Sequence, residues 1–285
     1  MIKIQDVSFK YKSSEKIIDG INFEIAEGEI VAIVGKNGSG KSTIGKLIAG
    51  ILKLKEGKIL IDDEDSKKSK DNKIGIVFQN PENQIIFSSI KDELSFSLKD
   101  LNEDEVNERI EEALKNVEML EYKDRNLYDL SLGQKQRIMI AEILAKKSKY
   151  IILDEPTTMI DSIGKEKIYK IIKKLKSQGY TIICITNLAD EILLADRTLI
   201  LEKGKIALEV KKEELIKRAS EFKKYEIKLP TILELLVELQ KAGVQVNAEE
   251  YTIQEIVNSI LAFEANMSAE IKKEGALKWK TQLHF

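Results

Sequence analysis

The stretch "GKNGSGKS", residues 35–42, combines glycines, a lysine and hydroxyls at a spacing that suits phosphate chemistry. It fits the pattern G-x-x-x-x-G-K-[ST], directly after an apolar run typical of a strand and before a helical pattern. Glycines let successive backbone N–H groups turn towards a phosphate, and the start of a helix adds positive potential there. We therefore predict a phosphate-binding loop in which Lys41 reaches the β and γ oxygens of a nucleotide and Ser42 ligates Mg²⁺. The candidate binding residues are Gly35, Asn37, Gly38, Ser39, Gly40, Lys41, Ser42 and Thr43. The alternative is a glycine turn that binds nothing, against which the flanking strand and helix argue.

A second candidate site lies in "YIILDEP", where two carboxylates follow an apolar run. Asp154 is placed to hold Mg²⁺ through water. Glu155 is placed to orient or deprotonate the water that attacks a γ-phosphate, a reaction in which positioning and charge stabilisation do most of the catalysis. Taken alone, these two residues could be a polar strand end. Together with the phosphate loop, they favour a nucleotide-hydrolysing site.

The elements that must position these residues alternate between strands and helices. Short β-branched runs with helical patterns between several of them predict a mostly parallel α/β fold with antiparallel strands at its start. These runs are "INFEI", "EIVAIV", "KILI", "KIGIVF", "YIILD", "TIICIT" and "RTLIL". From Asn102 a helix cap, an acidic first turn and apolar residues at helical spacing predict a helix, within a helical insertion at about 80–148. Its apolar face comprises Val106, Ile110, Leu114 and Val117.

The chain changes character after Gly204, where a lysine-rich stretch follows. Pro230 is placed to open an amphipathic helix that Gly243 can stop. Thr252 and Glu255 form a capping-box pattern before a further helix. Its predicted apolar face holds Ile253, Ile256, Val257, Ile260 and Leu261. We predict two domains, 1–210 and 211–285, the second small and helical, and a solvated charged loop at 62–73.

Composition narrows the class of protein. The chain has 46 basic and 48 acidic side chains, so no charge excess favours nucleic acid or an anionic membrane surface. The N-terminus lacks a secretory pattern, and the apolar runs fall short of the roughly 20 residues that span a bilayer. The single cysteine, Cys184, cannot form an internal disulfide and is expected in the core of a cytoplasmic protein.

The stretch "LSLGQKQR", 130–137, lies between the two candidate sites, and with it the chain resembles the nucleotide-binding subunits of ATP-binding cassette (ABC) transporters. The likeness covers roughly residues 2–210. It includes, in order, an aromatic Tyr11, the phosphate loop, Gln79 after "GIVF", the LSGGQ-like signature, "ILDEP" and "TTMID". Several motifs in the family's order are more specific than any one of them.

The resemblance implies a dimer in which two ATP molecules each lie between one subunit's phosphate loop and the other's signature. It implies that Tyr11 stacks on adenine, although a core aromatic at a strand end is the alternative, and that Gln79 senses Mg²⁺ and the attacking water. Ser131, Gly133 and Gln134 are expected to contact the γ-phosphate bound to the partner chain. Asp161 is expected to link the two sites.

Two stretches, "QNPENQIIFSSIKDELSF" and "EPTTMID", are more narrowly similar to the ATPases of energy-coupling factor transporters, which import vitamins and, in related systems, nickel or cobalt ions. The C-terminal helices resemble those through which such ATPases contact each other. The resemblance implies a membrane-embedded scaffold subunit and a substrate-binding membrane subunit as partners. The ATPase would then be a peripheral protein at the cytoplasmic face of the cell membrane.

The sequence departs from the family at two positions. Asn187 stands where the family has a histidine that contacts the γ-phosphate, and the one histidine, His284, lies near the C-terminus. An asparagine side chain can donate a hydrogen bond but carries no charge and moves no proton, so hydrolysis at this chain's own site is expected to be slow or abolished. Leu132 replaces the first signature glycine, where a side chain could block the approach to phosphate.

These departures favour a heterodimer with a fully equipped ATPase over a homodimer that carries both defects twice. They also leave open a nucleotide-binding partner or regulator that does not hydrolyse ATP. A soluble cassette ATPase of DNA repair or translation is a further alternative. Such proteins typically have a long coiled-coil insertion or two cassettes in one chain, and this sequence has neither.

Overall fold

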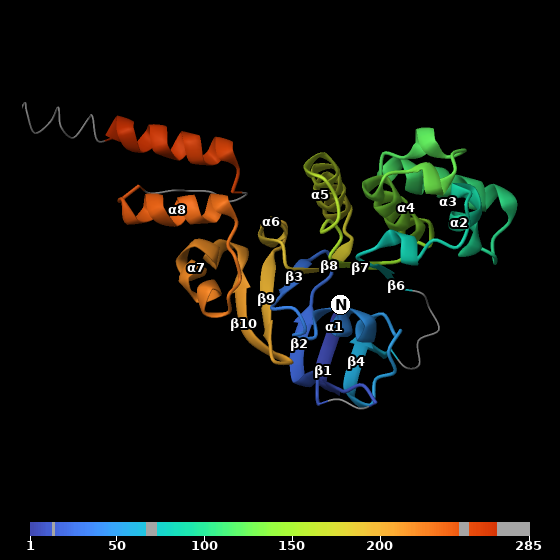
Figure 1. Cartoon of the computed structure of the whole chain (residues 1–285), viewed down its shortest axis with the longest axis horizontal. Helices are drawn as coiled ribbons and strands as arrows, with labels where there is room; N and C mark the ends of the chain where they lie inside the picture. Colours follow the sequence, from blue (N-terminus) through green and yellow to red (C-terminus); the bar gives the residue numbers. More distant parts are fainter. Residues whose placement is uncertain (13–14, 67–72, 245–250, 267–285) are drawn as a thin grey trace, which may run out of the picture. The chain divides into compact units, whose positions relative to one another are not determined.

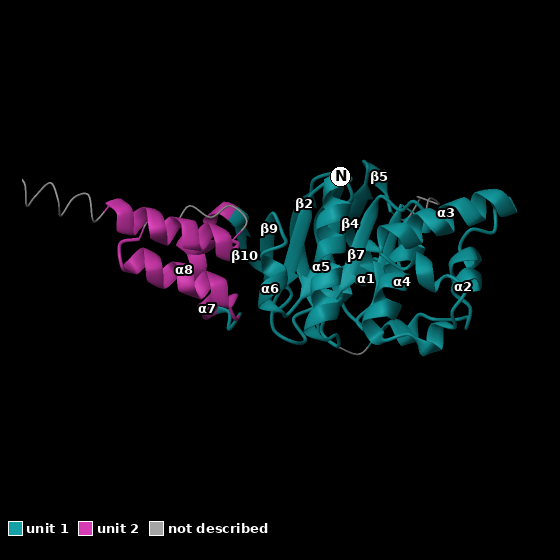
Figure 2. Ribbon diagram, turned by 90° about the horizontal axis from the view of Figure 1, so that it is seen from above, with its two compact units in different colours: residues 1–212, 225–227 teal, residues 213–224, 228–285 magenta. Residues whose placement is uncertain are grey.

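The computed structural model describes residues 1–12, 15–66, 73–244 and 251–266 (Figure 1). Its contacts divide the chain into two compact units (Figure 2). The first comprises Met1–Lys212 and Tyr225–Ile227, and the second comprises Glu213–Lys224 and Lys228–Phe285. The three residues 225–227 therefore belong to the first unit although helices of the second unit lie on either side of them in the sequence.

A six-stranded sheet in the order β10-β9-β3-β8-β7-β6 forms the centre of the first unit. All neighbouring strands are parallel except β10, which is antiparallel to β9. The strands are β3 (Ile30–Val34), β6 (Ile74–Val77), β7 (Tyr150–Asp154), β8 (Thr181–Thr186), β9 (Arg197–Glu202) and β10 (Lys205–Lys211). The three central strands β3, β8 and β7 are buried along their whole length, which explains their continuous apolar sequences. Helices α1 (Lys41–Ile48), α5 (Ser162–Ser177) and α6 (Ala189–Ile192) follow β3, β7 and β8.

A second, four-stranded sheet has the order β2-β1-β4-β5 and is antiparallel. It consists of β1 (Ile2–Phe9), β2 (Ile18–Ile25), β4 (Glu56–Ile61) and β5 (Glu64–Asp65). The antiparallel start expected from the sequence is thus present, and a shared apolar core joins this sheet to α1 and the six-stranded sheet. Strand β5 corrects the prediction of a loop throughout 62–73. Its two residues pair through their backbone with β4, and a strand of that length has no side-chain periodicity to read.

One arginine lies at the joint between the two sheets. Arg197 begins β9, and its guanidinium contacts Glu29 just before β3 at 2.5 Å and Glu209 in β10 at 2.7 Å. It also donates to the backbone carbonyl of Glu24 near the end of β2. A single side chain with a planar guanidinium group therefore connects strands of both sheets.

A group of helices lies next to the β6 edge of the six-stranded sheet (Figure 1). They are the 3₁₀ turns Pro81–Asn83, Leu120–Tyr122 and Leu127–Asp129 and the helices α2 (Ile90–Phe96), α3 (Glu103–Asn116) and α4 (Leu132–Ala145). The cap predicted at Asn102 is present as a complete capping box with Glu105. Helix α4 packs closely on β6, because a Cβ atom added to Gly75 would lie 2.3 Å from Ile143.

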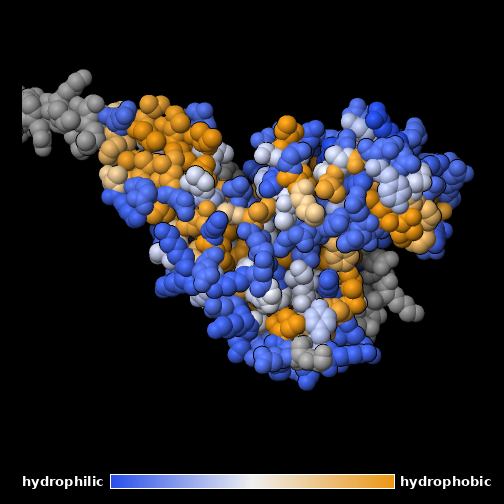
Figure 3. Space-filling view, viewed as in Figure 1, coloured by the Kyte–Doolittle hydropathy of each residue, from blue (hydrophilic) through white to orange (hydrophobic). Residues whose placement is uncertain are grey.

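The second unit contains α7 (Leu215–Lys224), α8 (Thr231–Lys241) and a further helical stretch at 253–266. Pro230 precedes α8 and Gly243 follows it with a φ of 86°, as the sequence predicts. The capping box of Thr252 and Glu255 is also present. Ile256 is buried, whereas part of the predicted apolar face is exposed and forms an apolar surface together with α8 (Figure 3). The exposed residues are Leu235, Ile253, Val257 and Leu261. His284 lies outside the described residues, among which no helix is both long and apolar enough to cross a bilayer.

Candidate active site

The phosphate loop leaves the carboxyl end of β3 and enters α1 at Lys41. Gly40, directly before the helix, has a φ of 107°, and a Cβ atom there would lie 2.6 Å from the side chain of Ile18. Both its backbone conformation and the lack of space therefore require glycine at this position. The N–H groups of the first turn of α1 lie at the end of this loop, where a helix attracts anions.

Lys41 is almost completely buried inside the loop that precedes it. Its Nζ donates hydrogen bonds to the carbonyl oxygens of Gly35 at 2.7 Å and Lys36 at 3.1 Å. Burial lowers the pKa of Lys41, an effect that the nearby carboxylates of Glu155 and Asp154 partly oppose. The ammonium group is thus held in the loop by neutral acceptors that phosphate oxygens could replace.

Ser42 and Asp154 meet at the ends of α1 and β7. The hydroxyl of Ser42 donates to Oδ1 of Asp154 at 2.9 Å, and burial raises the pKa of Asp154. A hydroxyl and a carboxylate next to a phosphate loop provide the oxygen ligands that Mg²⁺ takes from proteins, with water and phosphate supplying the others. These residues therefore fit a magnesium ion.

Glu155 has an unusual backbone and a fully engaged carboxylate. Its φ is 50°, and its N–H donates to the carbonyl oxygen of Ile185 in β8 at 2.7 Å. Its carboxylate accepts hydrogen bonds from the side-chain amides of Gln79 at 2.8 Å and Asn187 at 3.0 Å, and from the hydroxyl of Thr158 at 3.2 Å. The structure thus brings together the three residues predicted to be catalytic, Gln79, Glu155 and Asn187.

Asn187 also contacts the phosphate loop. Its Nδ2 donates to Oδ1 of Asn37 at 2.7 Å as well as to Glu155. One amide group therefore bridges the loop and the carboxylate, using both of its N–H bonds. Asn187, which the sequence resemblance aligns with a histidine, thus contacts both neighbours without adding charge.

Tyr11 lies beside the same loop and is not a core residue. Its side chain is 41% exposed, and its hydroxyl lies 3.5 Å from the hydroxyl of Thr43. The ring packs edge-on against Phe9, with 5.0 Å between the ring centroids. It borders a hollow of about 620 Å³ that is also lined by Ser42 and Asp154. The exposed ring is consistent with the predicted stacking on a base, whereas the alternative of a core aromatic does not fit.

The signature residues lie at the start of α4 and hold each other. Ser131 caps the helix: its hydroxyl accepts from the N–H of Gln134 at 3.3 Å, and the side chain of Gln134 accepts from the N–H of Ser131 at 2.9 Å. In the described part of the chain, no hydrogen bond joins Ser131, Gly133 or Gln134 to the phosphate loop. A Cβ atom at Gly133 would lie 3.1 Å from Ile160, so this glycine allows close packing against the segment before Asp161.

Leu132 was expected to block the approach to phosphate. Leu132 is the first residue of α4 and has an ordinary helical backbone, so replacing glycine causes no backbone strain there. Only its side chain could hinder a phosphate.

Asp161 caps α5 by accepting from the N–H of Gly164 at 2.7 Å. Its predicted link between two nucleotide sites stays a prediction.

Some contacts at the site were not foreseen. Lys135 and Gln136 of α4 are buried and hold the segment around Gln79, through Glu82 at 2.6 Å and the carbonyl oxygen of Phe78 at 3.2 Å. Both residues directly follow the signature in the sequence. Their spacing does not show whether a polar residue of a helix is buried or exposed, so these contacts could not be predicted.

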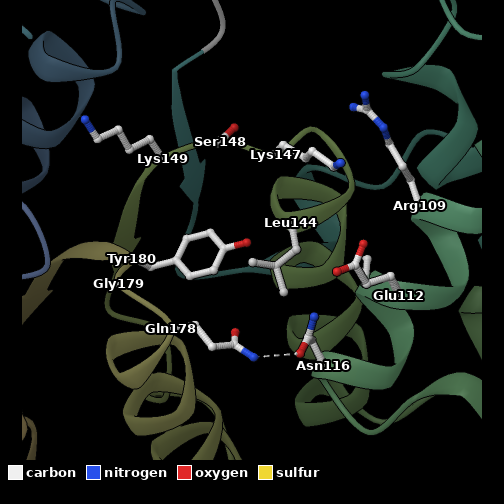
Figure 4. Close-up of a pocket in the computed structure, with 11 residues that line it drawn as sticks. Arg109, Glu112, Asn116, Leu144, Lys147, Ser148, Lys149, Gln178, Gly179 and Tyr180 are labelled. Atoms are coloured by element: carbon white, nitrogen blue, oxygen red, sulfur yellow. Dashed lines mark hydrogen bonds between the residues drawn. The ribbon is translucent and has the colours of Figure 1, made fainter.

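A separate hollow of about 280 Å³ lies at the other ends of the strands (Figure 4). Lys149 and Tyr180, which line it, precede β7 and β8, whereas ligands of open α/β sheets bind at the carboxyl ends of the strands. Leu144 and Gln178 place the C-terminal ends of α4 and α5 there, whose carbonyl groups disfavour phosphate. The hollow beside the phosphate loop therefore stays the candidate nucleotide site.

Comparison with known proteins identifies the family. The family model described as ABC transporter matches residues 18–158. The energy-coupling factor transporter ATP-binding protein EcfA1 of Caldanaerobacter subterraneus is 38% identical over 272 residues, which are 91% of this chain and 98% of that protein. The protein of the same name from Bacillus subtilis is 34% identical, over 94% of this chain and 98% of its own length.

Solved structures agree with these matches. CbiO1 of Clostridium perfringens, described as part of the ABC transporter complex CbiONQ, superposes with a TM-score of 0.71 at 34% identity, over 82% of this chain and 98% of its own. A dimeric ATP-binding cassette in a post-hydrolysis state, bound to ADP and phosphate, gives a TM-score of 0.67 at 30% identity, over 74% of this chain and 99% of its own. The predicted fold, an ABC nucleotide-binding domain with an antiparallel sheet and a helical insertion, is confirmed. The chain belongs to the ABC transporter family, and within that family it is an ATP-binding protein of the energy-coupling factor type.

Proposed function

We propose that this chain binds Mg-ATP beside its phosphate loop and powers an importer of vitamins or transition-metal ions. The observation that carries the proposal is the set of contacts at the carboxyl ends of β3 and β7. There Lys41 occupies the phosphate loop, Ser42 meets Asp154, and Glu155 meets Gln79 and Asn187.

Lys41 and the loop would hold the triphosphate. When ATP binds, the ammonium of Lys41 exchanges the carbonyl oxygens of Gly35 and Lys36 for phosphate oxygens, a stronger charge-assisted contact. The exposed ring of Tyr11 would stack on adenine. Ser42, Asp154 acting through water, and Gln79 would hold Mg²⁺, which neutralises charge that develops on the transferred phosphoryl group.

Glu155 would orient or deprotonate the water that attacks the γ-phosphate. Gln79 and Asn187 hold its two carboxylate oxygens, so the carboxylate has a defined direction before ATP arrives. Asn187 supplies this orientation but neither positive charge nor a proton, which supports slow hydrolysis at this chain's own site. The rival function, a cassette that binds ATP without hydrolysing it, rests on the same residue and on Leu132.

A second ABC ATPase would complete the site. Ser131, Gly133 and Gln134 would contact the γ-phosphate bound to that partner, and Asp161 would link the two sites. We favour a heterodimer, because a homodimer would carry both departures twice. The exposed apolar residues of the second unit, together with the resemblance to energy-coupling factor ATPases, support this unit as a contact between ATPases.

Membrane partners would complete the importer. The similarity to CbiO1, which is described as part of the ABC transporter complex CbiONQ, supports a membrane-embedded scaffold subunit and a substrate-binding membrane subunit. The ATPase would then lie peripherally at the cytoplasmic face of the cell membrane. A soluble non-transport cassette is the less supported alternative, since the relatives described above are transporter proteins.

The test is ATP turnover by the complex reconstituted with its membrane partners, comparing the wild type with Asn187→His. We expect the rate at saturating ATP to rise roughly tenfold or more, because an imidazole adds charge and proton transfer where the amide has neither. The affinity for Mg-ATP should change little. An unchanged rate would show that Asn187 is not the lesion, and a wild type without Mg-dependent ATP affinity would refute the proposed function itself.

A further inference from the structure

A carboxylate that takes no part in the proposed chemistry lies buried behind the catalytic loops. Glu191 of α6 has no exposed surface. One of its oxygens accepts a hydrogen bond from the hydroxyl of Thr157 at 2.5 Å, and the other accepts from the thiol of Cys184 at 3.4 Å. The side chain of Thr186 is a further hydrogen-bond partner. Burial raises the pKa of Glu191, as expected for a carboxyl group removed from water.

The partners of this carboxylate come from the two segments that carry the catalytic residues. Thr157 lies two residues after Glu155, in the segment that follows β7. Thr186 ends β8 directly before Asn187, and its hydroxyl accepts from the N–H of Leu188 at 2.8 Å. Burying a carboxyl group is costly unless its oxygens are hydrogen-bonded. Here those bonds join the loop after β7 to the loop after β8.

The backbone conformation of Glu155 suggests what the connection between these two loops does. With a φ of 50°, Glu155 adopts a left-handed conformation that residues other than glycine rarely populate and that persists only where its surroundings hold it. On one side, its own N–H donates to Ile185 in β8 at 2.7 Å. On the other side, two residues later, the hydroxyl of Thr157 donates to Glu191 and lies 3.5 Å from the hydroxyl of Tyr169.

We propose that Glu191 is a positioning residue for ATP hydrolysis: by holding Thr157 and Thr186, it keeps the carboxylate of Glu155 aligned with Asn187. Glu191 is fully buried, so in this proposal it acts only through these loops. The inference rests on the proposed role of Glu155 as the group that directs the attacking water.

The test measures turnover at saturating ATP and the KM for ATP in the reconstituted complex. Thr157→Val removes the hydroxyl while keeping the shape of the side chain. We expect the rate to fall about tenfold, with KM and Mg-ATP affinity unchanged within about twofold, since the phosphate loop is not altered. Glu191→Gln retains an oxygen that can accept from Thr157, so it should keep the rate within about threefold of wild type, whereas Glu191→Ala should match or exceed the loss in Thr157→Val.

Thr181→Val is the matched control. Thr181 is also buried in β8, and its hydroxyl accepts from the N–H of Gly28 at 2.9 Å, but it lies at the opposite end of the strand. The Thr181→Val variant also loses a buried hydrogen bond, so its rate shows the effect of destabilisation alone. A rate in Thr157→Val no lower than in Thr181→Val, or a loss of ATP affinity in Thr157→Val, would overturn the inference.

The Glu155→Gln background separates this inference from the proposed function. If Glu191 acts through Glu155, then adding Thr157→Val to Glu155→Gln should cause no further loss of rate. A wild-type rate equal to that of Glu155→Gln would refute the role of Glu155 and the inference with it. If Glu155→Gln is slow while Thr157→Val and Glu191→Ala behave as wild type, only the inference is wrong.

Discussion

Lys41 is held in position before any nucleotide binds, by two backbone carbonyl oxygens of its own loop. These bonds compensate in part for the loss of water around a buried ammonium group. The same burial lowers the pKa of Lys41, so a fraction of the lysine loses its charge at a lower pH than an exposed lysine would. Its affinity for a polyanion should therefore depend on pH.

We expect the affinity for Mg-ATP to fall as the pH rises through the alkaline range below the ordinary pKa of lysine. The sign follows from the charge: protonated Lys41 attracts the triphosphate, and the lowered pKa removes that proton earlier on the alkaline side. The measurement is the dissociation constant for Mg-ATP across this range. Lys41→Arg keeps its charge throughout and should flatten the profile. An equally steep decline in Lys41→Arg would assign the titration to another group.

The residues of the site differ in how far the sequence could reveal them. Lys41, Ser42 and Asp154 follow from motif spacing alone, whereas Asn187 and Gln79 could be placed only through a family resemblance. Glu191 was not foreseen. In "NLADEIL" it looks like an acidic residue in the first turn of an exposed helix, and only the packing of α6 onto β8 turns it inward.

At the scale of elements, the close packing of α4 on β6 places the segment after β6, and with it Gln79. A Cβ atom at Gly75 would lie 2.3 and 2.6 Å from two carbons of Ile143. This contact connects β6, which precedes Gln79, to α4, which starts at the signature. Replacing the glycine tests how tightly the two are joined.

We expect Gly75→Ala to lower the free energy of unfolding by about 1–3 kcal/mol, the usual effect of overpacking a core. Chemical denaturation of the full chain measures this. Adding Ile143→Ala makes room for the new methyl group, so the double variant should be less destabilised than the sum of the two single variants. Strict additivity would show that the two positions are not in contact.

Most elements were predictable because their pattern lies in consecutive residues. The buried strands β3, β7 and β8 follow from apolar runs, and the start of α3 follows from Asn102 and its capping box. Strand β5 could not be predicted, since its two residues are held by pairing with β4 rather than by a pattern of their own. The backbone of Leu132 could not be predicted from the residue type either, because Leu132 is the first residue of a helix that Ser131 caps.

At the scale of the whole molecule, the division near residue 210 stays a prediction, although the contacts form two compact units. The segment Tyr225–Ile227 belongs to the first unit: Glu226 contacts Lys36 of the phosphate loop at 2.7 Å, and the hydroxyl of Tyr225 lies 3.5 Å from the carbonyl oxygen of Ala207. Both side chains of the ion pair are largely exposed, at 49% and 74%, so it contributes about 0–1 kcal/mol.

A chain truncated to residues 1–212 should therefore unfold in one cooperative transition and bind Mg-ATP within several-fold of the full chain. The reason is that both sheets and every predicted residue of the nucleotide site lie within this stretch. Denaturation and nucleotide titration measure the two outcomes. A truncated chain that does not fold would contradict an independent first domain.

The joint at Arg197 has a consequence for which ligands the protein accepts. Tyr11 follows β1 in the four-stranded sheet, whereas the phosphate loop follows β3 in the six-stranded sheet, and Arg197 ties the two sheets together. The proposed contacts with the base and with the phosphates thus belong to two different sheets. A molecule must reach both to gain both contacts, so we expect a nucleoside triphosphate to bind more tightly than inorganic phosphate.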